Sequence, residues 1–78
     1  MTRSKKPTAG DAAVLVAIPP GLLNDLPPED QRAIAEVVGK PIRLVEYDED
    51  GRAELEFTDS ENVIHSIWVD PRYISLHE

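Results

Sequence analysis

Three short runs rich in β-branched and aromatic residues follow one another in the second half of the chain and constrain its fold more than any other feature. They are Pro41–Tyr47, Arg52–Thr58 and Val63–Val69, separated by the turn-forming clusters Asp48–Gly51 and Asp59–Asn62. Runs of this length between such clusters predict three consecutive antiparallel strands, a β-meander. Asp50-Gly51 is the strongest hairpin signal, because glycine takes at little cost the positive φ that a tight turn requires.

Side-chain alternation along the runs predicts which face of the sheet is buried. The central run is the clearest, because Glu54 and Glu56 alternate with apolar residues. One face of the meander should therefore be core and the other solvated. The side chains that we expect in the core are Ile42, Leu44, Ala53, Leu55, Phe57, Val63, His65, Ile67 and Val69.

The two outer runs are less regular. In the third run, the set that contains His65 is more apolar than the set that contains Trp68, so we expect Trp68 to point outward and His65 to point inward, where it needs a polar partner. In the first run, strict alternation puts Tyr47 on the outer face together with Arg43 and Val45.

Two further strands and one helix are predicted outside the meander. Ala13–Ile18 is a short apolar run, and Ile74–His77 follows a turn or single 3₁₀ turn at Pro71, which cannot continue a ladder. The helix is expected over about residues 28–38, because proline and acidic residues suit a first helical turn and Gly39 is a typical C-terminal stop. We expect it to cover a face or an end of the sheet.

The length of 78 residues allows one small domain with a thin core. Residues 1–11 contain no periodic apolar side chain, so we expect a disordered tail followed by a single domain over residues 12–78. The absence of cysteine excludes disulfides, thiolate metal sites and cysteine nucleophiles, and it fits a cytoplasmic location. The longest apolar run, Ala12–Ile18, is too short to span a membrane.

Charge is distributed unevenly along the chain. The first 13 residues carry three bases and one acid, whereas the remainder carries five bases and fourteen acids, a net charge of −9. An anionic domain repels phosphate backbones, which argues against nucleic acid as a partner. The acids either keep a small domain soluble and monomeric or meet a basic protein partner, and the sequence leaves both open.

No constellation of catalytic or metal-binding residues is recognisable, and we expect no enzymatic activity, cofactor or metal. His65 and His77 are far apart and one of them lies at the terminus, which does not suit a metal site. Glu54 and Glu56 share one side of a strand, as paired catalytic carboxylates can, but outward acids on a half-exposed strand have the same pattern. No Gly-rich phosphate loop is present.

The closing segment Trp68–Ile74 is similar to that of SH3-like barrels, in which an apolar strand leads into a turn with a proline and, two residues later, an aromatic residue before the last strand. The resemblance implies a mainly β fold with one short helix, a small and partly open barrel of four or five strands. Pro71 and Tyr73 match positions that help to form the proline-rich peptide groove of SH3 domains, but the acidic, aromatic loop and the paired tryptophans of that groove have no counterpart. The chain also resembles small uncharacterised bacterial proteins, which implies no activity.

An exposed aromatic and acidic surface that binds another protein is the functional hypothesis. We expect this surface to centre on Trp68, with Tyr47, Pro71 and Tyr73 nearby, because tryptophan and tyrosine are enriched in interface hot spots. The partner would be a protein, with basic residues to match the acids; the oligomeric state stays open. Two alternatives also stay open: Trp68 can belong to the core, where its burial is a large gain, or the protein can be a small regulator that contacts nucleic acid through its basic N-terminal tail.

Overall fold

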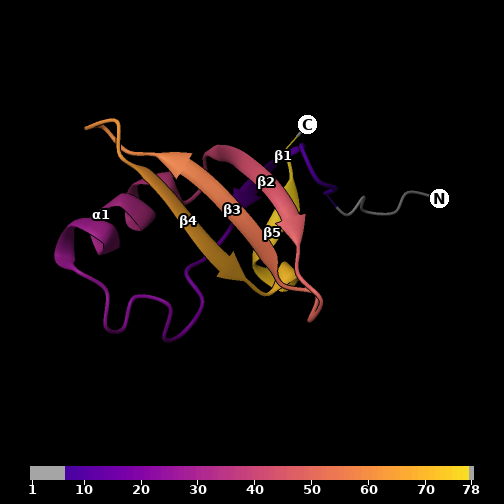
Figure 1. Cartoon of the computed structure of the whole chain (residues 1–78), viewed down its shortest axis with the longest axis horizontal. Helices are drawn as coiled ribbons and strands as arrows, with labels where there is room; N and C mark the ends of the chain where they lie inside the picture. Colours follow the sequence, from indigo (N-terminus) through magenta and orange to yellow (C-terminus); the bar gives the residue numbers. More distant parts are fainter. Residues whose placement is uncertain (1–6, 78) are drawn as a thin grey trace.

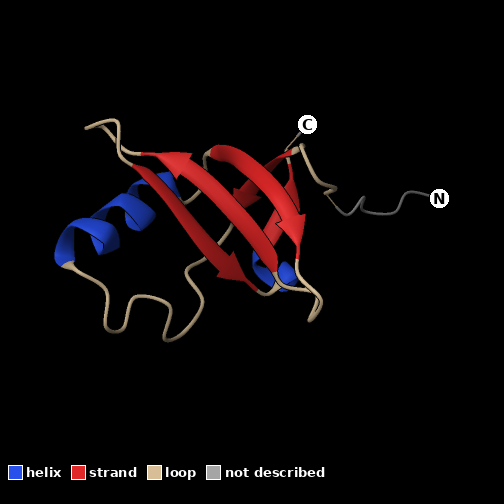
Figure 2. Ribbon diagram, viewed as in Figure 1, coloured by secondary structure: helices blue, strands red, loops and turns tan. Residues whose placement is uncertain are grey.

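The computed structural model describes residues 7–77 and shows a mainly β domain with a single antiparallel sheet and one α-helix (Figures 1 and 2). In chain order the elements are β1 (Ala12–Leu15), α1 (Pro28–Val37), β2 (Pro41–Tyr47), β3 (Ala53–Thr58), β4 (Ile64–Val69), the 3₁₀ turn η1 (Pro71–Tyr73) and β5 (Ile74–Leu76). The predicted mainly β class with one short helix, the meander and the 3₁₀ turn are confirmed. Among these residues, no helix is long and apolar enough to cross a membrane.

The five strands have the order β4-β3-β2-β1-β5, so the meander forms one side of the sheet and β1 joins it to β5. The strands β4 and β5 are the two edges and do not pair with each other, so the sheet is not closed into a barrel. The strand β1 ends at Leu15, three residues earlier than predicted. The N–H of the next residue, Val16, donates to the Tyr73 carbonyl, after which the chain leaves the sheet for the loop that leads to α1.

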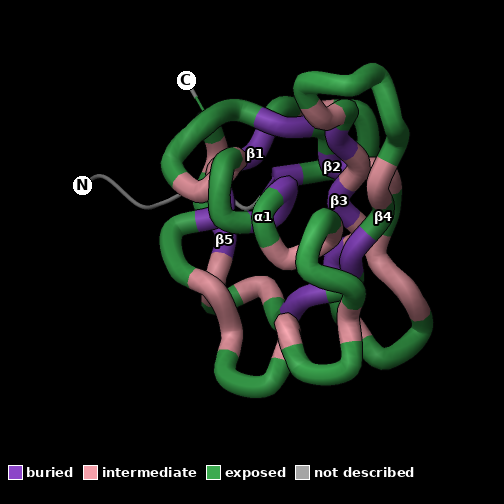
Figure 3. Tube along the Cα trace, turned by 90° about the vertical axis from the view of Figure 1, so that its left-hand side faces the viewer, coloured by how far each residue is buried: buried purple, intermediate pink, exposed green. Residues whose placement is uncertain are grey.

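The helix α1 covers one end of the curved sheet. It lies beside the end that carries the β3–β4 turn in Figure 1, and it lies within the curve of the strands when the molecule is viewed from that side in Figure 3. Ala33 and Ile34 are its buried residues. Three leucines of the preceding loop, Leu22, Leu23 and Leu26, also pack against the core. The buried core itself consists of Ala13, Leu15, Ala33, Ile34, Ile42, Leu44, Ala53, Leu55, Phe57, Ile67, Val69 and Ile74.

The β2–β3 hairpin begins with Asp48. Its carbonyl accepts from the N–H of Gly51 at 3.0 Å, and its side-chain Oδ1 accepts from the N–H groups of Asp50 and Arg52 at 2.9 and 2.8 Å. Gly51 follows with φ of 84°, which confirms the positive φ predicted there. A type I turn followed by such a residue is a favoured three-residue hairpin.

The β3–β4 hairpin repeats this construction with different residues. The carbonyl of Asp59 accepts from the N–H of Asn62 at 3.0 Å, and its Oδ1 accepts from the N–H groups of Glu61 and Val63 at 2.8 and 3.0 Å. Asn62 has φ of 66° and therefore occupies the position that Gly51 has in the other hairpin. Asparagine tolerates this conformation better than most residues with a side chain.

We expect Gly51→Val to destabilise the domain by about 1–2 kcal/mol, because a β-branched side chain resists positive φ. Gly51→Asn is the matched control, since asparagine already serves at the same position of the other hairpin, and it should cost much less. Urea unfolding of the two variants measures the difference. Equal stability of the valine and asparagine variants would contradict the turn geometry.

A bulge in β2 reverses the predicted side for Tyr47. Leu44 lies opposite Leu55, but Glu46 already lies opposite Glu54, so Val45 is an extra residue in the ladder. One extra residue shifts every later side chain to the other face. Tyr47 therefore packs against the core instead of lying on the outer face, and the predicted side is wrong.

The predicted tail is too long at its C-terminal end. The N–H of Gly10 donates to the Leu44 carbonyl at 2.8 Å, and the N–H of Leu44 donates to the Asp11 carbonyl at 2.9 Å, which extends the pairing of β1 with β2. Tyr47 Oη also donates to the Pro7 carbonyl at 2.7 Å. Residues 7–11 thus have defined hydrogen bonds, whereas the prediction for residues 1–6 lies outside the described residues.

Candidate protein-interaction surface

The outer face of β4 carries two large apolar side chains in contact with solvent. Ile64 is 67% exposed and Trp68 is 39% exposed, and Ser66 lies between them. Their neighbours Ile67 and Val69 point to the opposite face and are buried. Alternation along the strand therefore predicted the direction of Trp68 correctly, and the alternative that placed it in the core is wrong.

Carboxylates line the next strand beside these side chains. Trp68 lies opposite Glu54 and Ser66 lies opposite Glu56 in the antiparallel register. The Ser66 hydroxyl also donates to Glu54 Oε2 at 3.0 Å. We call the set Ile64, Ser66, Trp68, Glu54 and Glu56 the β4 patch. It combines an apolar stripe on the edge strand with an acidic stripe on its neighbour.

Neither carboxylate of the acidic stripe forms an ion pair with another residue in the described part of the chain. Arg43 lies directly opposite Glu56 across β2 and β3, as the sequence suggested, yet none of the ion pairs among residues 7–77 joins them. Glu46 on β2 lies opposite Glu54 and adds a further acid to the same face. The outer face of the meander is therefore an acidic surface that can attract a cationic group.

The other predicted partner-binding residues do not join Trp68 in this patch. Tyr47 faces the core side, and burial, with a smaller contribution from the charge of Asp11, raises the pKa of its phenol. Tyr73 also packs against the core, with the Arg72 guanidinium 5.8 Å from its ring centre. Pro71 opens η1 and is half-buried. The expected cluster of three aromatic side chains on one surface is not formed, because the bulge sends Tyr47 to the opposite face.

His65 has the polar partners that an inward position requires. Its Nε2 lies 2.8 Å from Asp59 Oδ2, and its Nδ1 lies 3.6 Å from Asp30 Oδ1 in the first turn of α1. The imidazole stacks on the Phe57 ring, with centroids 5.3 Å apart. His65 therefore links the helix, the β3–β4 hairpin and the core. Within residues 7–77, no group of three or more His, Asp or Glu side chains is arranged to hold a metal ion.

Acid should weaken the contact between His65 and Asp59, because it protonates the Asp59 carboxylate. The hydrogen bond with His65, followed by the N–H of Val63, lowers the pKa of the Asp59 carboxyl from its ordinary value of 3.8. The folded state therefore binds this proton less readily than the unfolded chain. The stability that the carboxylate contributes is fully present above its unfolded pKa, and it is lost as the pH falls through the lower folded value.

We accordingly expect Asp59→Asn to flatten the dependence of the unfolding free energy on pH in the acid range below about pH 4. Urea titrations across this range measure the slope. Glu49→Gln removes an exposed carboxyl from the other hairpin and is the matched control. A slope in Asp59→Asn equal to that of the parent protein would contradict the proposed role of the carboxylate.

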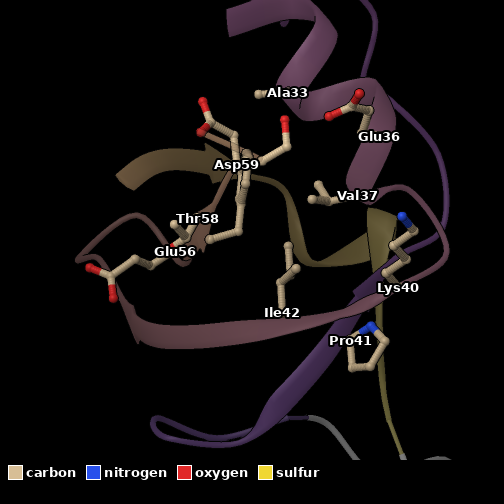
Figure 4. A pocket seen from close by; sticks show the side chains of 11 residues that line it. Ala33, Glu36, Val37, Lys40, Pro41, Ile42, Glu56, Thr58 and Asp59 are labelled. Atoms are coloured by element: carbon tan, nitrogen blue, oxygen red, sulfur yellow. The ribbon is translucent and has the colours of Figure 1, made fainter. Parts of the chain in front are cut away.

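An open cavity of about 390 Å³ lies between α1 and the strands β2 and β3 (Figure 4). Val37 of the helix and Ile42 of β2 point into it, while Glu36 and Lys40 lie at its edge. An apolar wall beside charged groups can receive a long side chain with an apolar stem and a polar end. Sequence reasoning missed this cavity, because helix packing creates it from residues far apart in the chain.

Comparisons with known proteins add no relative. No family model matches the chain, and neither a curated protein nor a solved structure is significantly similar to it. The resemblance to SH3-like barrels therefore stays a prediction.

Proposed function

We propose that this protein is a small acidic interaction module that binds another protein through the β4 patch. The observation that carries the proposal is the exposure of Trp68 and Ile64 on the same face of an edge strand. Tryptophan offers a large contact area with few rotatable bonds, and such residues carry much of the binding free energy in protein interfaces. No enzymatic activity is part of this proposal.

The charge of the patch supports a partner with a basic surface. Glu54 and Glu56 lie beside the apolar stripe, and the chain carries a formal net charge of −7. Such a surface accelerates encounters with a cationic protein and disfavours anionic ones. It also supports a protein partner over the alternative of nucleic acid bound through the basic N-terminal residues, because phosphate backbones require Lys and Arg.

Two further properties belong to the same proposal. The order of elements, with η1 between the fourth strand and the last, supports a relationship to SH3-like barrels. The lack of cysteine supports a cytoplasmic location. Neither property identifies the partner, because one fold can carry many unrelated functions.

Trp68→Ala should leave the fold intact and abolish recovery of the partner in affinity purification from the native cell extract. Val16→Ala is the matched control, since Val16 is a similarly exposed apolar residue outside the patch. A hot-spot tryptophan typically contributes about 2 kcal/mol or more, so Kd should rise by about 30-fold or more. Undiminished partner recovery by Trp68→Ala, with intact circular dichroism, would contradict the proposal.

A further inference from the structure

The free edge of β4 exposes a defined set of backbone groups. The N–H of Asp59 donates to the Val63 carbonyl at 2.9 Å, so this opposite pair is hydrogen-bonded. Hydrogen-bonded and non-bonded pairs alternate along an antiparallel ladder. His65 and Ile67 therefore bond to β3, whereas Ile64, Ser66 and Trp68 direct their N–H and C=O groups away from it.

No described segment pairs with this edge. Among residues 7–77, β3 is the only strand beside β4, and the backbone hydrogen bonds of the turns and loops include none to Ile64, Ser66 or Trp68. Figure 1 shows β4 at the border of the sheet. The strand is regular over its whole length and contains neither lysine nor proline, which commonly protect edges from pairing.

We propose that β4 accepts an extended segment of the partner protein as a sixth strand, and that this segment places a Lys or Arg opposite Ser66. The inference rests on the proposed function and specifies how the β4 patch is used. Strand addition obtains affinity from backbone hydrogen bonds and specificity from alternate side chains. The free backbone groups of Ile64, Ser66 and Trp68 supply the hydrogen bonds. The outer face of the β4 patch supplies the contacts with the alternate side chains of the added strand.

The basic residue follows from the shape and charge of the patch. Ser66 is small and lies between Ile64 and Trp68, so it leaves a gap between two apolar side chains. Glu56 of β3 lies opposite Ser66, on the side of this gap away from the free edge. Neighbouring strands are about 4.8 Å apart, so the added strand would lie about 10 Å from β3, within reach of a long cationic side chain. Its stem would contact the apolar stripe and its charge would face the carboxylate.

A second copy of the chain is a poorer occupant than a basic segment. Two β4 strands could pair about Ser66, but each copy brings a formal net charge of −7 and its own row of carboxylates. Like charges brought together across an interface oppose association. A basic segment has the opposite charge and meets no such repulsion.

A synthetic peptide tests the inference with the intact protein. In the sequence Thr-Val-Thr-Arg-Thr-Val-Thr, alternation puts Val, Arg and Val on one face, and the control peptide has Glu in place of Arg. We expect the Arg peptide to shift the Trp68 emission and to bind at least tenfold more tightly than the Glu peptide. It should also slow amide exchange at Ile64, Ser66 and Trp68. Equal binding of the two peptides, or unchanged exchange at these amides, would overturn the inference.

Ser66→Pro against Ser66→Ala isolates the backbone contribution. Both variants lose the hydroxyl that donates to Glu54, but only proline removes the N–H at the free edge. We expect the proline variant to bind the Arg peptide at least tenfold more weakly than the alanine variant, since the two share the loss of the hydroxyl and differ in the N–H. If circular dichroism shows that Ser66→Pro impairs folding, amide exchange at Ile64, Ser66 and Trp68 of the parent protein with the Arg peptide decides whether the edge pairs with an added strand.

The outcomes separate this inference from the proposed function. Loss of natural partner binding in Trp68→Ala, with unaffected binding in a folded Ser66→Pro variant, would retain the patch and overturn strand addition. A stable dimer of the parent protein in sedimentation, lost in Ser66→Pro, would assign the edge to a second copy and overturn the inference. Retained partner binding in Trp68→Ala would remove the proposed function itself.

Discussion

Replacing Phe57 by alanine is expected to destabilise the domain by about 3–5 kcal/mol, as is typical of buried aromatic residues. Phe57 is only 6% exposed, and its ring stacks on His65, so the truncation leaves a cavity and also removes support from the link to α1. A domain of this size has a total stability of about 4–12 kcal/mol. The substitution should therefore remove at least about a quarter of the stability of the domain.

Urea unfolding followed by circular dichroism measures this loss. Glu56→Gln is the matched control, because Glu56 is the preceding residue and faces the opposite side of the same strand. It should change the stability by less than about 0.5 kcal/mol, as surface substitutions usually do. The reverse ranking would mean that the strand has its faces exchanged, which follows from a one-residue error in register.

Replacing Ile34 by alanine should cost about 2–5 kcal/mol through the loss of helix docking. Ile34 is 1% exposed and is the largest buried side chain of α1. Isolated helices of this length are marginal in water, so α1 depends on packing against the sheet. The variant should therefore lose helical signal at lower urea concentrations than the parent protein.

Arg32→Ala is the control for this second variant, since Arg32 lies on the exposed side of the same helix. It should be almost neutral, because alanine is a good helix former and Arg32 forms no ion pair with the other described residues. Similar midpoints for the two variants would contradict the docking of α1 through Ile34. Amide exchange within α1 would then show whether the helix unfolds independently of the sheet.

The elements that local chemistry specifies were predicted closely. β2 matches its predicted bounds, and α1 ends one residue before its expected end because Val38 already has a non-helical ψ of 128°, ahead of Gly39 with its positive φ. Turn residues such as Gly51 act through their own backbone conformation, so they can be recognised without knowledge of distant contacts. Of the four nominated partner-binding residues, only Trp68 lies in the β4 patch, and partner binding by this patch stays a prediction.

The position of Tyr47 shows why local alternation is insufficient. The bulge at Val45 adds one residue to β2, but no glycine marks it, and the run reads as a regular strand. The irregularity becomes visible only when β3 supplies the opposing register. Tyr47 then reaches the Pro7 carbonyl, a contact between residues far apart in sequence.

The sequence by itself determined the mainly β class, the meander, its turns and the outward direction of Trp68, because each depends on residues within a few positions of one another. Only the tertiary structure decided that Trp68 stays exposed. Ile67 and Val69 occupy the core face of β4, where Ile34 of α1 also packs, so the face that carries Trp68 stays in contact with solvent. The free edge of β4 and the cavity beside α1 were also decided at this level. They depend on which strands and which helix face become neighbours, and that choice is made by long-range packing.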